Sequence, residues 1–103
     1  MTEELKNRDM DLRELFVAQQ YEAVVTILDS MEDDQVLELA LTNWDVVKKY
    51  YDSDRVDLLR KYVTFVAYES LLIEYAGKRG LLIGKEFEDK YNLFEEIYIK
   101  LQA

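Results

Sequence analysis

The chain contains no proline, and its three glycines all lie between positions 77 and 84. Most of the sequence therefore lacks the residues that interrupt helices and that form the tight turns of β-proteins. Over the same stretches, apolar residues recur at steps of three and four, which is the spacing of one face of an α-helix. These features predict an all-α fold. The length of 103 residues fits a single domain.

The first half of the chain is expected to hold two short helices. One should begin at Asp11, because its carboxylate can cap free amide groups and Glu14 completes a capping-box pattern. Residues 1–9 precede this helix and are expected to be disordered or frayed. Gln19 and Gln20 interrupt the apolar stripe that follows, so we expect the chain to break there.

Longer helices are expected to complete a compact four- to five-helix bundle. One begins at Asp33 or Asp34 and ends near Tyr51, the next follows the turn at 52–54 and ends at Gly77, and the last spans about 85–101. The middle one of these is apolar around most of its circumference between Tyr62 and Ala76, so it must be covered on most sides. It is expected to be either the central helix of the bundle or half of a subunit interface.

The three glycines raise the question of a phosphate-binding loop. Such a loop needs two glycines separated by four residues, followed by Lys and then Ser or Thr. Gly80 and Gly84 are one residue too close, and Glu86 stands where the hydroxyl is required. We therefore interpret Gly77 or Gly80 as the left-handed end of the long helix and Gly84 as the start of the last one. Residues 81–83 are expected to cover the end of the bundle.

The sequence offers little catalytic chemistry. Histidine and cysteine are absent, so the usual nucleophile–base pairs and zinc sites cannot form. The stretch 52–63 lacks the oxygen ligand, the glycine and the glutamate that a calcium loop needs at its positions 5, 6 and 12. Glu69 and Glu74 are the best acid–base candidates, because burial in the apolar helix would raise their pKa values. They point about 140° apart, however, and form no pair.

Charge is unevenly distributed along the chain. Acidic residues outnumber basic ones by 22 to 13, and no basic residue occurs between Arg13 and Lys48. A surface of this sign repels nucleic acids and anionic lipids at long range, so we expect neither partner. No segment has the pattern of a signal peptide or a membrane-spanning helix, and the protein is expected in the cytoplasm.

These features predict a non-enzymatic, acidic protein–protein interaction module without metal or cofactor, a regulator or inhibitor that binds a basic surface of another protein. The predicted partner-binding residues are the carboxylates of the acidic region and two adjacent tyrosines, one of which should be exposed: Glu22, Asp29, Glu32, Asp33, Asp34, Glu38, Tyr50 and Tyr51.

A homodimer is also predicted, because eight tyrosines are more than a small core needs and tyrosine is frequent at interfaces. Its interface residues would be Tyr62, Phe65, Tyr68, Leu72 and Tyr75. Two other functions remain open. One is a nucleic-acid mimic whose carboxylates imitate phosphates and block a DNA-binding protein. The other is a small enzyme that uses the carboxyl group of Glu69 or Glu74.

Overall fold

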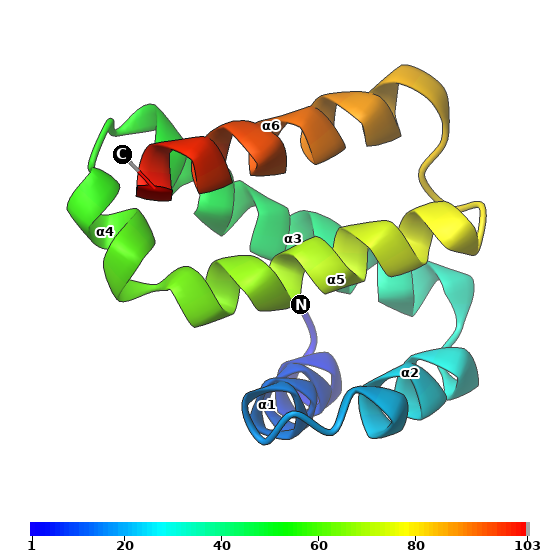
Figure 1. Ribbon diagram of the computed structural model, residues 1–103. Coiled ribbons are helices and arrows are strands. Elements are labelled where there is room, and N and C mark those ends of the chain that lie inside the picture. Colours follow the sequence, from blue (N-terminus) through cyan, green and yellow to red (C-terminus); the bar gives the residue numbers. More distant parts are fainter. Residues whose placement is uncertain (103) are drawn as a thin grey trace.

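The computed structural model describes residues 1–102, and helices make up 84% of the chain. Within this range there are six helices and no strand: α1 (Glu3–Val17), α2 (Tyr21–Ser30), α3 (Asp33–Asp52), α4 (Val56–Lys61), α5 (Val63–Lys78) and α6 (Gly84–Gln102). The predicted all-α class is confirmed (Figure 1). None of the described helices has both the length and the apolar character needed to cross a membrane.

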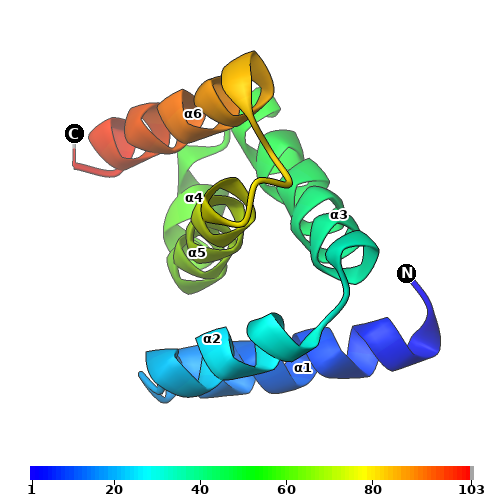
Figure 2. The same cartoon turned by 90° about the vertical axis from the view of Figure 1, so that its right-hand side faces the viewer.

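The helices are arranged around α5. Figure 2 shows α1 and α2 side by side as one layer, α3 and α5 next to each other above it, and α6 on the opposite side. Helix α5 contacts α1, α3, α4 and α6, so it takes the central position, one of the two that its apolar sequence predicted. The core draws on every helix, with fully buried Leu12, Val24, Leu28, Val36, Leu39, Ala40, Val47, Leu59, Val66, Leu72, Ala76 and Ile97.

Helix α1 begins eight residues earlier than the sequence predicted. The hydroxyl of Thr2 accepts a hydrogen bond from the amide of Leu5 at 3.2 Å, and the Leu5 side chain is buried. A threonine cap and a buried leucine thus stabilise residues 3–9, which were wrongly expected to be disordered or frayed. The predicted break is confirmed, because α1 ends at Val17 and Gln19 adopts a φ of 61° before α2 starts.

The long helix expected between the turn at 52–54 and Gly77 is divided into α4 and α5. Tyr62 interrupts it with φ −108° and ψ 28°, and for this reason the chain has six helices rather than four or five. The Tyr62 ring stacks on Tyr50 with centroids 5.2 Å apart. The interruption contains neither glycine nor proline, so a contact between distant residues accompanies it rather than a local signal.

The glycines act as the sequence indicates. Gly80 has a φ of 82° just after α5, and Gly84 opens α6 with a φ of 60°. Gly77 has a different role, since a Cβ atom there would lie 2.5 Å from the ring of Phe87. Of residues 81–83, Leu82 is buried as expected, but Ile83 is 71% exposed and does not cover the bundle.

Candidate protein-binding groove

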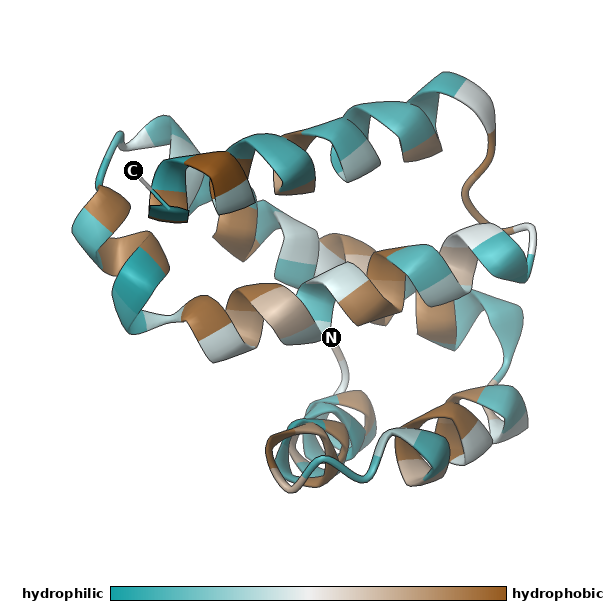
Figure 3. Cartoon of the chain, in the orientation of Figure 1, coloured by the Kyte–Doolittle hydropathy of each residue, from teal (hydrophilic) through white to brown (hydrophobic). Residues whose placement is uncertain are grey.

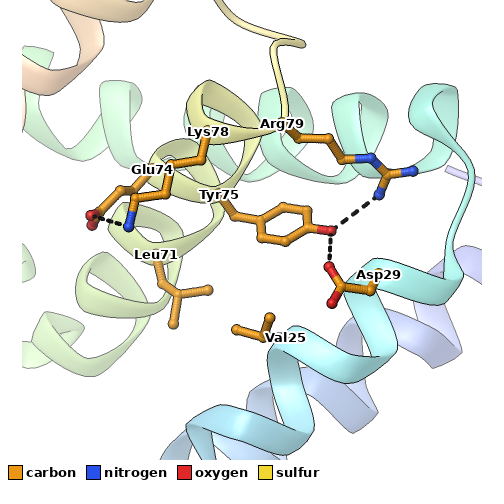
Figure 4. Close-up of a pocket in the computed structure, with 7 residues that line it drawn as sticks. All are labelled: Val25, Asp29, Leu71, Glu74, Tyr75, Lys78 and Arg79. Atoms are coloured by element: carbon orange, nitrogen blue, oxygen red, sulfur yellow. Dashed lines mark hydrogen bonds and ion pairs between the residues drawn. The ribbon is translucent and has the colours of Figure 1, made fainter.

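A groove of about 740 Å³ lies between α2 and the C-terminal half of α5 (Figure 4). Its lining is formed by Val25, Asp29, Leu71, Glu74, Tyr75, Lys78 and Arg79. On α2 the spacing of four between Val25 and Asp29 places both side chains on one face. Leu71 and Tyr75 have the same spacing on α5. The two helices therefore each present an apolar side chain with a polar one next to it.

Tyr75 links the two walls of this groove. Its hydroxyl donates a hydrogen bond to Asp29 Oδ1 at 2.6 Å and accepts one from Arg79 Nη1 at 3.2 Å (Figure 4). Burial and the hydrogen bond to Asp29 raise the pKa of the Tyr75 hydroxyl. The phenol therefore remains a proton donor at neutral pH and keeps α2 connected to α5.

Arg79 closes one end of the groove. Its guanidinium group donates to the backbone oxygens of Leu28 at 3.0 Å and Met31 at 2.7 Å, and it pairs with Asp33 at 2.9 Å. The carbonyl of Met31 lies just past the end of α2, where a helix leaves such groups without an internal partner, and the Leu28 carbonyl also accepts from the Met31 amide at 3.1 Å. Arg79 follows α5 directly, so one side chain joins the ends of two helices to the start of α3. This role could not be predicted from sequence, because it depends on three separate elements.

Two smaller cavities lie between α1 and the N-terminal half of α5. Their volumes are about 330 and 180 Å³, and both are lined by Phe16, Val17 and Thr64. The larger also reaches Tyr21 and Ala67. The ring of Phe16 packs against Tyr21 and, on its other side, against the buried Tyr68, with centroid distances of 5.3 and 5.8 Å.

The three cavities follow one another along α5. Tyr21 and Val25 are one turn apart on α2, and Ala67 and Leu71 are one turn apart on α5, so neighbouring residues on both walls line the larger α1 cavity and the α2 groove. We call this set of cavities the α5 groove. Figure 1 shows the helices that supply its walls, with α5 above the layer of α1 and α2.

The α5 groove exposes apolar side chains to solvent. Val17, Tyr21, Val25 and Val63 line it and are 66%, 48%, 38% and 42% exposed. Figure 3 colours many residues of α2 and α5 as hydrophobic, whereas most of α6 is coloured as hydrophilic. An apolar surface of this extent is what the binding of another apolar surface would cover.

The six predicted partner-binding carboxylates are all exposed. Asp29 lines the α5 groove, and Glu22 shares its face of α2. The other four lie at the junction of α2 and α3 and along the first turns of α3: Glu32, Asp33, Asp34 and Glu38. Asp29 therefore lies in the groove and Asp33 beside Arg79 at its end, whereas Glu38 pairs with the N-terminal amino group at 3.7 Å and lines none of these cavities.

The two predicted tyrosines lie elsewhere. Tyr50 and Tyr51 are near the other end of α3, about 27 Å along the axis from its start. Tyr50 stacks on Tyr62, and the Tyr51 hydroxyl donates to Glu96 at 2.8 Å. Both residues are half-buried, and the Tyr51 hydroxyl bonds Glu96 at the surface, as expected for one surface aromatic of the two. Their part in partner binding stays a prediction.

The predicted dimer interface is divided in a similar way. Tyr68 and Leu72 are buried in the core of the chain, with 1% and 0% exposure, and cannot contact a second copy in this fold. The sequence could not show which side of the apolar helix is covered by the protein itself. Tyr62, Phe65 and Tyr75 are half-buried, and the last two line the α5 groove.

A buried polar cluster behind the groove connects α1, α3 and α5. The carboxylate of Asp9 accepts hydrogen bonds from Tyr68 at 2.8 Å and Asn43 at 3.0 Å and pairs with Arg13 at 2.8 Å. The Arg13 guanidinium also lies over the ring of Phe65 at 4.6 Å. Sequence reasoning missed Asp9 and Asn43. The signal was present, because each polar residue occupies a position within an apolar helical stripe.

The two carboxylates that were considered for catalysis lie in different surroundings. Glu69 is fully buried with no hydrogen-bond partner for either oxygen, and burial raises its pKa well above the usual value. Its carboxyl group is closed off from any substrate. Glu74 is exposed on the rim of the α5 groove and pairs with Lys78 at 3.3 Å. Among residues 1–102 no group of His, Cys, Asp and Glu side chains is arranged to hold a metal ion.

No protein-family model matches the chain, and no curated protein or solved structure is significantly similar to it. Its function must therefore be argued from the shape, the exposed apolar surface and the charge of the α5 groove.

Proposed function

We propose that the protein is a non-enzymatic interaction module that holds a segment of another protein in the α5 groove. The observation that carries this proposal is the set of exposed apolar side chains in the lining of these cavities, Val17, Tyr21, Val25 and Val63. Exposed apolar patches with polar residues at their rim often mark interaction sites. Tyr and Phe side chains in the lining suit a protein partner, since aromatic residues are enriched at such interfaces.

The charge of the protein supports a basic partner. The net charge is −9, and the acidic residues of α2 and the α2–α3 junction stand beside the groove. Opposite charge on the partner would speed association and discourage unrelated acidic proteins. Acting as a regulator or inhibitor, the module would occupy a basic segment that its partner needs for another contact.

A peptide selection tests the proposal. A display library of random 16-residue peptides is selected on the immobilised protein, and enriched peptides are tested against Val25→Asn and Val46→Asn. The two valines are 38% and 36% exposed, both lie in helices, and only Val25 lines the groove. We expect enriched peptides that lose about fivefold or more in affinity with Val25→Asn and keep it with Val46→Asn. The proposed function would be refuted if the enriched peptides bind Val25→Asn with unchanged affinity, or if no peptide is enriched.

A further inference from the structure

The walls of the α5 groove restrict the conformation of its occupant. They are formed by α1, α2 and α5, whose interior backbone groups are already hydrogen-bonded within each helix. No sheet edge is available there to pair with an extended peptide. A helical occupant satisfies its own backbone groups and can present apolar side chains at steps of three and four to the successive cavities.

The length of the groove sets the length of this helix. Its lining on α5 runs from Val63 to Lys78, a rise of about 22 Å at 1.5 Å per residue. About four turns, or roughly 15 residues, would cover it. The cavities at the two ends are both lined by apolar side chains, with Val17 and Val63 at one and Val25 and Leu71 at the other. A helix with one apolar stripe along its whole length would contact all of them.

The lining of the α2 end holds two carboxylates, Asp29 and Glu74, and two cations, Lys78 and Arg79. Helix α2 carries Glu22 and Asp29 and no basic residue. The nearest cations are committed, since Arg79 pairs with Asp33 and with backbone oxygens, and Lys78 pairs with Glu74. Glu22 is exposed, and no ion pair of its carboxylate occurs among the described residues. Positively charged side chains of an occupant would therefore be attracted to this end of the groove.

We infer that the α5 groove binds the apolar face of a cationic amphipathic α-helix of about four turns, with its basic residues concentrated beside α2. This inference rests on the proposed function and specifies the class of its partner. Apolar side chains of the helix fill the three cavities, and its lysine or arginine residues lie opposite the carboxylates of Glu22 and Asp29.

Three synthetic peptides of 16 residues test the inference. The first is an amphipathic helix of Leu and Lys, the second has the same composition without an apolar face, and the third replaces every Lys with Glu. Affinity for the full chain is measured by fluorescence anisotropy. We expect the first peptide to bind at least about tenfold more tightly than either of the others.

Matched variants locate the binding site. Val25→Asn should weaken binding of the Leu/Lys helix about fivefold, and Val46→Asn should change it less than about twofold. Glu22→Gln should weaken it about twofold, whereas Glu86→Gln, an exposed position at the start of α6, should not. Chemical shift changes in a two-dimensional NMR spectrum should concentrate on the lining of the groove.

The outcomes separate the inference from the proposed function. Equal binding of the scrambled or the acidic peptide, or equal effects of Val25→Asn and Val46→Asn on the Leu/Lys helix, would overturn the inference. If extended or acidic peptides from the random library bind and lose affinity with Val25→Asn, the proposed function stands and the inference of a cationic helix fails. If no peptide of either experiment depends on Val25, both fail.

Discussion

At the level of single residues, Glu69 is the most unusual group in the core. Its side chain is fully buried, and neither oxygen has a hydrogen-bond partner. Burial is the main cause of its raised pKa, and the charge of Asp9 adds to it, while Arg13 and Lys90 act in the opposite direction. The native state therefore keeps the carboxyl group protonated at pH values where the unfolded chain has already lost this proton.

This difference makes stability depend on pH. Because the pKa of Glu69 is higher in the folded state, its contribution is complete below the usual value of 4.5 and is lost as the pH rises through the folded-state pKa. Between these values it lowers the free energy of unfolding by up to about 1.4 kcal/mol per pH unit. Glu69→Gln has no titrating carboxyl group, so the stability of the variant relative to the wild type should rise as the pH increases from 4.5 toward the folded-state pKa of Glu69.

Urea unfolding at several pH values measures this effect. Comparing wild type with variant cancels the other carboxylates, and Glu74→Gln serves as an exposed control that should follow the wild type. Parallel stability profiles for the wild type and Glu69→Gln would show that Glu69 is ionised in the folded protein.

The hydroxyl group of Tyr68 allows a second prediction about stability. Its hydroxyl donates to the buried carboxylate of Asp9 at 2.8 Å. Tyr68→Phe keeps the ring but removes this donor, and we expect the free energy of unfolding to fall by about 1.5–3 kcal/mol, as for hydrogen bonds to charged groups. Chemical denaturation of this variant and of Tyr91→Phe, where the ring is exposed, provides the comparison. A loss no larger than that of the control would mean that Asp9 is satisfied without Tyr68.

At the level of elements, the packing of α6 on α5 depends on the missing side chain of Gly77. A Cβ atom there would lie 2.5 Å from the Phe87 ring. Gly77→Ala should therefore cost about 1–3 kcal/mol through overpacking, although alanine favours a helix by about 1 kcal/mol. With Phe87→Ala in the same chain the clash disappears, and Gly77→Ala should become stabilising. A double-mutant cycle by thermal or urea unfolding measures the change of sign. The same destabilisation in both backgrounds would exclude the clash as its cause.

Most elements could be predicted because their signals are local. The break at Gln19, the start of α3 beside Asp33 and the glycine after α5 each depend on residues within one turn of the boundary. The missed boundaries depend on distant contacts. The interruption at Tyr62 is accompanied by stacking on Tyr50, and the start of α1 by the burial of Leu5, and neither contact can be read from neighbouring residues. The start of α1 also has a local signal, the Thr2 cap, which was overlooked.

The candidate site was only partly predictable. The acidic residues were found because charge is visible in composition, and Asp29 does line the α5 groove. The apolar half of the site was missed, since Val17 and Val25 follow the same helical stripes as buried residues. Whether a position on such a stripe is covered depends on which helix packs against it. Here α1 and α2 leave one side of α5 open.

At the level of the whole molecule, the structure changes the expectation of a homodimer. The apolar helix packs against four helices of its own chain, which bury Tyr68 and Leu72, and a net charge of −9 repels further copies. Sedimentation at micromolar concentration should therefore give the chain mass of 12.3 kDa. A dimer that Val25→Asn dissociates would identify a second copy as the occupant of the α5 groove. A dimer that resists this substitution would require an interface elsewhere.

Arg79 has a consequence for how this protein can change over generations. The end of α2, the start of α3 and Tyr75 on α5 all depend on hydrogen bonds or an ion pair from this one side chain. Lysine offers a single charged nitrogen and cannot reproduce the several directed bonds of a guanidinium group. A substitution of Arg79 would thus remove contacts that join three helices. A single substitution at position 79 is therefore enough to remove the bonds that hold this end of the groove, and a change of partner could begin there.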